Sequence, residues 1–136
     1  MESRLQAAIA LRKAGEHEQS RGALKALADE PALRAQALLN IAWSFDNQGH
    51  ERDAEGYYLA AIEAGLSDED EFEARFGLAS TWRCHGKYPQ AKAQFAEIIA
   101  RWPQATEVPP FYALCLHNLA EPAAALALLL APPART

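Results

Sequence analysis

Apolar side chains along the chain recur with the period of a helix, and no segment shows the polar–apolar alternation of a half-buried strand. Ala, Leu, Glu, Gln, Lys and Arg dominate, and the only valine is Val108. Glycine and proline interrupt the pattern at intervals typical of helix lengths. The breakers are Gly15, Pro31, Gly49, Gly65, Gly86, Pro103, Pro109, Pro110, Pro122, Pro132 and Pro133. The pattern predicts an all-α protein.

The interruptions at Gly15, Gly49 and Gly86 are 34 and 37 residues apart, and a further 34 residues leads to Ala120. Aligning the chain on these four positions brings other residue types into register. Small residues precede the turn by seven positions and follow it by five: Ala8, Ala42, Ala79 and Ala113, then Ser20, Ala54, Ala91 and Ala125. Large residues precede it by four and follow it by nine: Leu11, Phe45, Trp82 and Leu116, then Leu24, Tyr58, Phe95 and Leu129.

This register has a physical cause in pairs of antiparallel helices. Small side chains let two backbones approach where they cross, and large side chains fill the space one turn away. A glycine at the turn adopts the left-handed conformation that ends the first helix. The three additional residues of the second interval lie near Ser67 and Asp70, which have the spacing of a capping box, so we expect one helix longer by about one turn.

The repeat resembles the tetratricopeptide repeat (TPR) family, in particular small stand-alone bacterial TPR proteins. The third unit matches best, and the resemblance covers essentially the whole chain. Its matching residues are Leu78, Ala79, Trp82, Gly86, Tyr88, Ala91, Phe95 and Pro103. The fourth unit departs most, because Ala120 replaces the turn glycine and Pro109 and Pro110 precede its first helix.

The resemblance implies a right-handed superhelical solenoid of about four units with eight antiparallel helices. We expect a single domain, 1–136, with repeats near 1–34, 35–71, 72–105 and 106–133. The expected helices are 3–14, 17–29, 33–48, 51–64, 68–85, 88–101, 108–119 and 122–131.

In the TPR family the first helix of each pair lines a concave face that binds partner peptides. The positions that correspond here, and that we expect to bind a partner, are Arg12, Leu39, Asn40, Trp43, Asn47, Phe76, Arg83, His117 and Asn118. The set mixes apolar surface with polar groups, as peptide sites do. The alternative is that Trp43 and Phe76 pack against neighbouring helices and the groove is unused.

One TPR subclass binds the carboxylate tails of chaperones through a clamp of basic and amide side chains. Asn40 matches the clamp asparagine, but Leu5, Ile9, Glu73 and Gly77 stand where the other clamp residues are expected. The departures argue against membership of that subclass.

The last expected helix has no polar face from Ala123 to Ala131. A helix that is apolar on all sides is normally buried on all sides, and repeat arrays usually end in a polar capping helix. We therefore expect Leu126, Leu128 and Leu130 to be covered by a second copy in a homodimer. A different partner, or partial exposure, is the alternative.

Composition narrows the partner classes. The 136 residues are 50% apolar and carry a formal charge of −5, which disfavours nucleic acid and anionic membranes. The longest apolar run is too short to span a bilayer, and the start lacks the features of a secretory signal. Two cysteines, Cys84 and Cys115, make no disulfide framework, so a cytoplasmic location is expected.

Catalytic and metal-binding roles are weaker alternatives. Cys84, His117 and Asn118 fall on neighbouring first helices, but no oxyanion-stabilising group is evident. Zinc binding by Cys84, His85 and His117 lacks a ligand spacing that would support it. We therefore predict a non-catalytic protein-interaction protein without a cofactor, and alternatively a self-association module with an empty groove.

Overall fold

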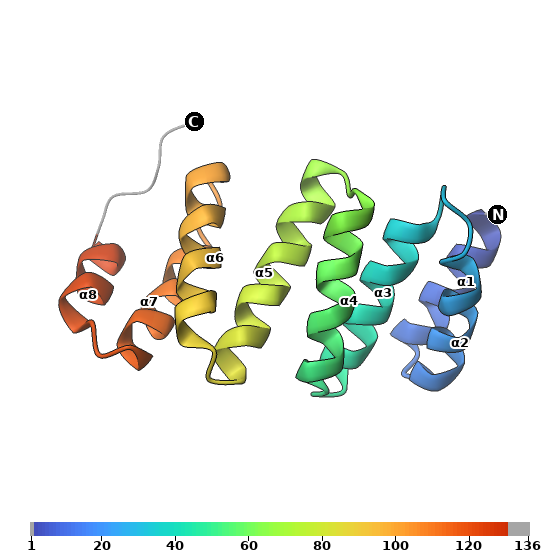
Figure 1. The fold of residues 1–136 in the computed structure, drawn as a ribbon, viewed down its shortest axis with the longest axis horizontal. Coiled ribbons are helices and arrows are strands. Elements are labelled where there is room, and N and C mark those ends of the chain that lie inside the picture. The colour runs from blue at the N-terminus through green and yellow to red at the C-terminus, as the bar shows by residue number, and fades with distance from the viewer. Residues whose placement is uncertain (1, 131–136) are drawn as a thin grey trace. The chain divides into compact units, whose positions relative to one another are not determined.

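The computed structural model describes residues 2–130, which form eight α-helices and contain no strand (Figure 1). The helices are α1 (Glu2–Lys13), α2 (His17–Leu27), α3 (Arg34–Asn47), α4 (Glu51–Ala64), α5 (Asp68–Cys84), α6 (Tyr88–Arg101), α7 (Val108–Asn118) and α8 (Pro122–Leu130). The bounds expected from sequence agree to within two residues. The expected last helix ends at 131 and the expected fourth repeat ends at 133. In both cases the part from 131 onward lies outside the described residues.

The turn inside each helix pair has the same backbone geometry. Gly15, Gly49 and Gly86 have φ angles of 85°, 76° and 80°, and Ala120 adopts 58° at the equivalent position. The amide after each of these residues donates to a carbonyl five positions earlier. These bonds are Glu16 to Leu11, His50 to Phe45, Lys87 to Trp82 and Glu121 to Leu116, at 2.8 to 2.9 Å. The fourth turn therefore keeps the left-handed geometry without a glycine.

The helices form two compact units, residues 1–74 and 75–136, and the boundary falls within α5 after Ala74. In the first unit, α3 packs into the groove between α1 and α2. The cluster that joins them consists of Leu5, Ala8, Leu24, Leu27, Leu33, Ala37 and Ile41. In the second unit, Ala113 and Leu116 of α7 pack with Ala125 of α8. The expectation of a single domain stays a prediction.

The aligned small residues occupy the interior, as the repeat register predicts. Ala8, Ala42, Ala79, Ala113, Ser20, Ala54, Ala91 and Ala125 are all buried. Ser20, which stands where the other repeats have alanine, donates its hydroxyl to the Ala8 carbonyl at 2.7 Å. The buried hydroxyl of Ser20 is thereby satisfied within its own helix pair.

The longer helix expected in the third repeat is α5, with 17 residues against 14 in each of α3, α4 and α6. The Ser67 hydroxyl accepts a hydrogen bond from the Asp70 amide at 3.2 Å, which caps its N-terminus. Four acidic residues occupy its first turn, where carboxylates interact favourably with the helix dipole.

Candidate protein-interaction surfaces

Four of the predicted site residues meet where α1 and α3 pack together. The Arg12 guanidinium donates from Nε to Asn40 Oδ1 and from one terminal nitrogen to Asn47 Oδ1, each at 3.3 Å. Its central carbon lies 5.4 Å from the centre of the Trp43 ring. Asn40, Trp43 and Asn47 share one side of α3 because they are three and four residues apart. We name these four residues the Arg12 cluster.

Two members of the predicted set lie in the interior and not on the surface. Leu39 is 0% exposed and Asn40 is 1% exposed, so neither presents a surface to a partner, and both support the exposed residues from within. The Asn40 side-chain amide donates to the Gln36 carbonyl at 2.9 Å while its oxygen accepts from Arg12. Asn40 is thus a buried support that fixes the position of Arg12, because both its donor and its acceptor find partners.

Burial also shapes the electrostatics of this cluster. Desolvation lowers the pKa of Arg12, although the guanidinium stays charged at any physiological pH. Nearby, buried Tyr58 donates its hydroxyl to Asp46 Oδ2 at 2.7 Å, and burial, followed by the charge of Asp46, raises the pKa of Tyr58. The surface of the cluster therefore presents a fixed, half-buried positive charge beside an indole ring and an exposed amide. Such a surface can pair with a carboxylate and contact an apolar side chain.

A second polar contact, absent from the sequence prediction, joins α2 to the other side of α3. Arg21 donates from one terminal nitrogen to Ser44 Oγ at 2.8 Å and to Gln48 Oε1 at 2.7 Å. Its guanidinium carbon lies 4.1 Å from the centre of the Phe45 ring, and His17 Nδ1 lies 2.8 Å from Ser44 Oγ. Arg12 and Arg21 therefore hold α3 from two sides. The sequence around Arg21 gives no signal that its guanidinium binds α3 and does not simply point into solvent.

In the second unit, Phe76 belongs to an aromatic cluster. Its ring lies edge-on to Phe111 at 5.3 Å and to Phe95 at 6.3 Å, and Phe95 stacks on Tyr112 at 5.9 Å. Phe76 is half-buried and Phe111 is exposed, so the cluster reaches the surface. Phe76 thus combines the two roles considered from sequence, packing against neighbouring helices and retaining an exposed edge.

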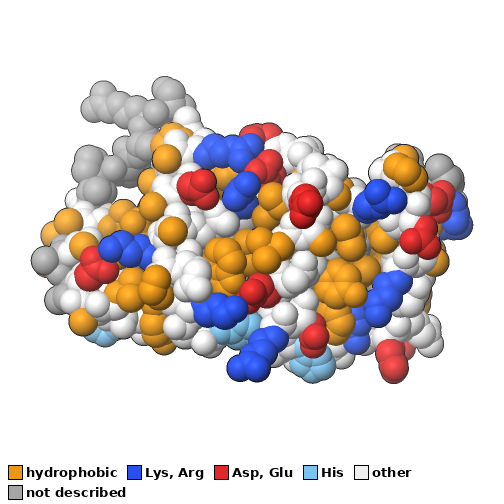
Figure 2. Space-filling view, viewed as in Figure 1, with side chains coloured by type: hydrophobic (Ala, Val, Ile, Leu, Met, Phe, Trp, Pro, Cys, Tyr) orange, Lys and Arg blue, Asp and Glu red, His pale blue; other side chains and the backbone are white. Residues whose placement is uncertain are grey.

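The remaining predicted residues of the second unit do not form a bonded group. Arg83 is half-buried in α5, and its Nε atom is buried without a hydrogen-bond partner among the described residues. His117 and Asn118 are exposed at the end of α7. Within residues 2–130 no hydrogen bond or ion pair links Arg83 to either of them. Figure 2 shows charged side chains of both signs among hydrophobic ones on the visible face, with no large patch of a single sign.

An open apolar groove lies between α7 and α8. Its volume is about 580 Å³, and we name it the α7/α8 groove. The lining residues are Pro110, Ala113, Leu114, His117, Ala125, Leu126 and Leu129. Leu114, Leu126, Leu129 and Leu130 are all exposed. The sequence pattern of α8 indicated an exposed apolar surface at this end of the second unit, and the structure adds residues of α7 to it.

The structure changes the set of exposed leucines. Leu126 and Leu130 are exposed in the single chain and so available for the predicted dimer contact, but Leu128 is half-buried against Ala113, Leu116 and Ala125 of its own chain. Leu129, which the sequence prediction left out, lines the groove. The signal for Leu129 was available, because it occupies the same register position as Leu24, Tyr58 and Phe95.

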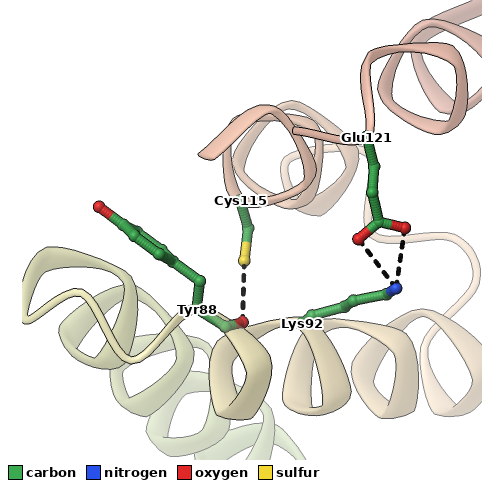
Figure 3. Close-up of polar contacts among 4 residues, drawn as sticks. All are labelled: Tyr88, Lys92, Cys115 and Glu121. Carbon is green, nitrogen blue, oxygen red and sulfur yellow. Dashed lines mark hydrogen bonds and ion pairs between the residues drawn. The ribbon is translucent and has the colours of Figure 1, made fainter. Parts of the chain in front are cut away.

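Polar contacts join α6 to α7 and to the residue that precedes α8 (Figure 3). Lys92 on α6 contacts both carboxylate oxygens of Glu121, the residue before α8, at 3.0 Å. The Cys115 thiol donates to the Tyr88 carbonyl at 3.4 Å. Burial raises the pKa of Cys115, and the positive charges of Arg83 and Lys92 oppose the shift. Cys115 is fully buried, so its thiol belongs to the interior of the second unit.

The cysteines and the acidic and histidine side chains offer little other chemistry among the described residues. Cys84 is exposed and Cys115 is buried, and both are free thiols. Between residues 2 and 130, no three His, Cys, Asp or Glu side chains are grouped closely enough to hold a metal ion. None of the helices in that range combines the length and the apolar character needed to cross a bilayer.

Comparison with known proteins gives a family and a group of similar solved structures, among them YrrB and MamA AMB-1. The family model described as tetratrico peptide repeat matches residues 35–135. YrrB, a TPR protein with an unusual peptide-binding site, is 15% identical with a TM-score of 0.44, over 93% of this chain and 81% of its own. MamA AMB-1 is 14% identical with a TM-score of 0.44, over 93% and 86%. No curated protein matches the sequence.

Proposed function

Because the chain belongs to the tetratricopeptide repeat family, whose fold is a scaffold for protein–protein interaction, we propose that it binds a protein or peptide partner without catalysis. The proposed surface is the one formed by the first helices of the pairs, which is the concave face in TPR proteins. In the first unit it comprises Arg12, Trp43 and Asn47, with Leu39 and Asn40 beneath them. In the second it comprises Phe76, Arg83, His117 and Asn118.

The observation that carries this proposal is the Arg12 cluster. A guanidinium that two asparagine side chains hold in place loses little conformational freedom when it binds. Trp43 beside it is half-buried and offers apolar area next to the charge. We therefore propose a partner segment with a carboxylate adjacent to an apolar side chain. The free thiols accord with the proposed cytoplasmic location, where reduced cysteines persist.

The test compares affinity capture by wild type, Arg12→Gln and Trp43→Ala with two matched controls. Arg52→Gln changes an exposed arginine on α4, and Leu59→Ala shortens an exposed leucine on the same helix. Partners of the proposed surface should be depleted by both site variants and retained by both controls. Circular dichroism melts confirm that each variant is folded. An unchanged partner set in folded Arg12→Gln and Trp43→Ala proteins contradicts the proposal for the first unit.

Self-association through α8 is the second candidate function. Its specific support is that Leu126, Leu129 and Leu130 are 55% to 74% exposed on a helix without a charged side chain. Light scattering after size exclusion should give a dimer for wild type and a monomer for Leu126→Glu/Leu130→Glu. A monomeric wild type at micromolar concentration would remove this candidate and leave the first one standing.

A further inference from the structure

The α7/α8 groove has the same construction as a groove that is filled elsewhere in the chain. In the first unit, α3 packs on Leu5 and Ala8 of α1 and on Leu24 of α2. The residues 105 positions later are Pro110, Ala113 and Leu129, and all three line the α7/α8 groove. Leu24 is 0% exposed beneath α3, whereas Leu129 is 55% exposed. The groove therefore has the residues that receive a helix, and no described helix occupies it.

The lining determines the chemistry of that helix. Among the seven lining residues only His117 is polar, and α8 carries no charged side chain. An occupant with acidic or basic residues on its contact face would bury unpaired charge, which is strongly unfavourable. The occupant must therefore present an apolar, uncharged face. In the first unit α3 does so with Leu33, Ala37 and Ile41, which recur every four residues.

A second copy of the chain could offer either α1 or α8. The α1 positions equivalent to Ala37 and Ile41 are Ser3 and Ala7, both exposed and both poor in apolar area. On α8, by contrast, Leu126, Leu129 and Leu130 form an uncharged stripe at helical spacing. If α1 of one copy entered the α7/α8 groove of the next, the copies would join head to tail in an open chain. If each copy placed α8 in the groove of the other, the two would be related by a two-fold axis.

We propose that the α7/α8 groove of one copy receives α8 of a second copy in a closed two-fold dimer. This inference rests on the second candidate function and specifies its geometry. Leu129 lies at the centre of the interface, with Leu114 and Leu126 around it, and the same surface of both copies takes part. The Arg12 cluster lies outside this contact surface.

The first measurement is solution mass. Wild type should be dimeric at micromolar concentration, and Leu129→Glu should raise the dissociation constant by about 100-fold or more, since it places a charge in an apolar contact. Leu59→Glu, at an exposed leucine on α4, is the matched control and should remain dimeric. A monomeric wild type overturns the proposal and assigns the groove to a helix of a different protein.

The second measurement distinguishes the two geometries by disulfide cross-linking in a Cys84→Ser background. Single cysteines at positions 126, 129 and 130 are oxidised separately, and at least one should give a covalent dimer because residues near a two-fold axis meet their own copies. A mixture of Ala7→Cys and Leu129→Cys chains should give no mixed product. If the Ala7→Cys and Leu129→Cys chains cross-link to each other and no cysteine of α8 cross-links to its own copy, the two-fold geometry is wrong. Self-association of the chain would still stand. A dimer with neither product places the interface elsewhere and also overturns the proposal.

Discussion

The two compact units fill equivalent repeat positions with different chemistry. In the first unit, Tyr58 is fully buried and its hydroxyl donates to Asp46. In the second, Phe95 is equally buried at the equivalent position and stacks on Tyr112 instead. Arginine contacts hold α3 in the first unit, whereas rings surround Phe95 in the second. The repeat therefore fixes the size of a side chain at a position, and the neighbours determine its polarity.

The largest expected loss of stability tests what the two units share, a large buried ring at equivalent positions. Tyr58→Ala and Phe95→Ala should each reduce the free energy of unfolding by about 3–5 kcal/mol, because both leave a cavity in a closely packed interior. Urea denaturation followed by circular dichroism measures the change. Leu59→Ala, at an exposed position, should stay within about 0.5 kcal/mol of wild type. A loss below about 1 kcal/mol at either buried ring would contradict the equivalence of the two positions.

Reciprocal exchange of the two rings tests the part that differs. Phe95→Tyr should cost about 1–3 kcal/mol, because the added hydroxyl enters an apolar aromatic environment. Tyr58→Phe should cost about 1 kcal/mol, because Asp46 is half-exposed and water can replace the lost donor. The same denaturation experiment gives both values. Equal tolerance of both exchanges would mean that the surroundings do not select the polarity.

The turns provide a third comparison, between glycine and alanine in the same conformation. Gly49→Ala should destabilise the first unit by about 1 kcal/mol, and Ala120→Gly should stabilise the second by up to about 1 kcal/mol. No atom lies within 4 Å of a Cβ added at Gly49, so the expected cost comes from its positive φ alone. Thermal melts of the two variants and wild type test the opposite signs. Shifts of the same sign would contradict the explanation.

The smallest expected effect is a dependence on alkaline pH in the second unit. Because burial raises the pKa of Cys115 above its ordinary value of 9.0, its contribution is complete below that value and is lost as pH rises toward the folded-state pKa. At pH 9 the thiol ionises more readily in the unfolded chain than in the folded one, so the protein should lose at most a few tenths of a kcal/mol of stability relative to pH 7. Cys115→Ala should abolish this difference in urea unfolding, whereas Cys84→Ser should retain it.

Sequence reasoning recovered the helices because glycine, proline and the register of small residues are local signals. The alignment placed Ala120 at the turn position, but its left-handed geometry is a finding of the structure, because an alanine gives no sequence signal for positive φ. The register did not indicate how deep a residue lies. Asn40 was assigned to the partner-binding face because its position corresponds to one on that face in the TPR family, yet Arg12 from another helix satisfies its oxygen in the interior. Such pairing across helices depends on side-chain directions that one sequence does not specify.

The same limit explains the errors on α8. An all-apolar segment contains no polar residue to mark its exposed side, so Leu128 was assigned to the surface and Leu129 was omitted. The comparison with Leu24 carried the necessary information. Equivalent positions in earlier repeats are thus a better guide to exposure than hydrophobicity within α8.

The open space around the turn glycines has a stereochemical consequence. At Gly15, Gly49 and Gly86 an added Cβ would have no other atom within 4 Å, so at that atom only the sign of φ disfavours an L-residue. For a D-residue positive φ is the favourable region, since its mirror-image geometry reverses the steric preference. D-alanine at position 49, introduced by chemical ligation, should therefore stabilise the protein by restricting the unfolded chain. The turn therefore selects the handedness of the residue and leaves room for its Cβ.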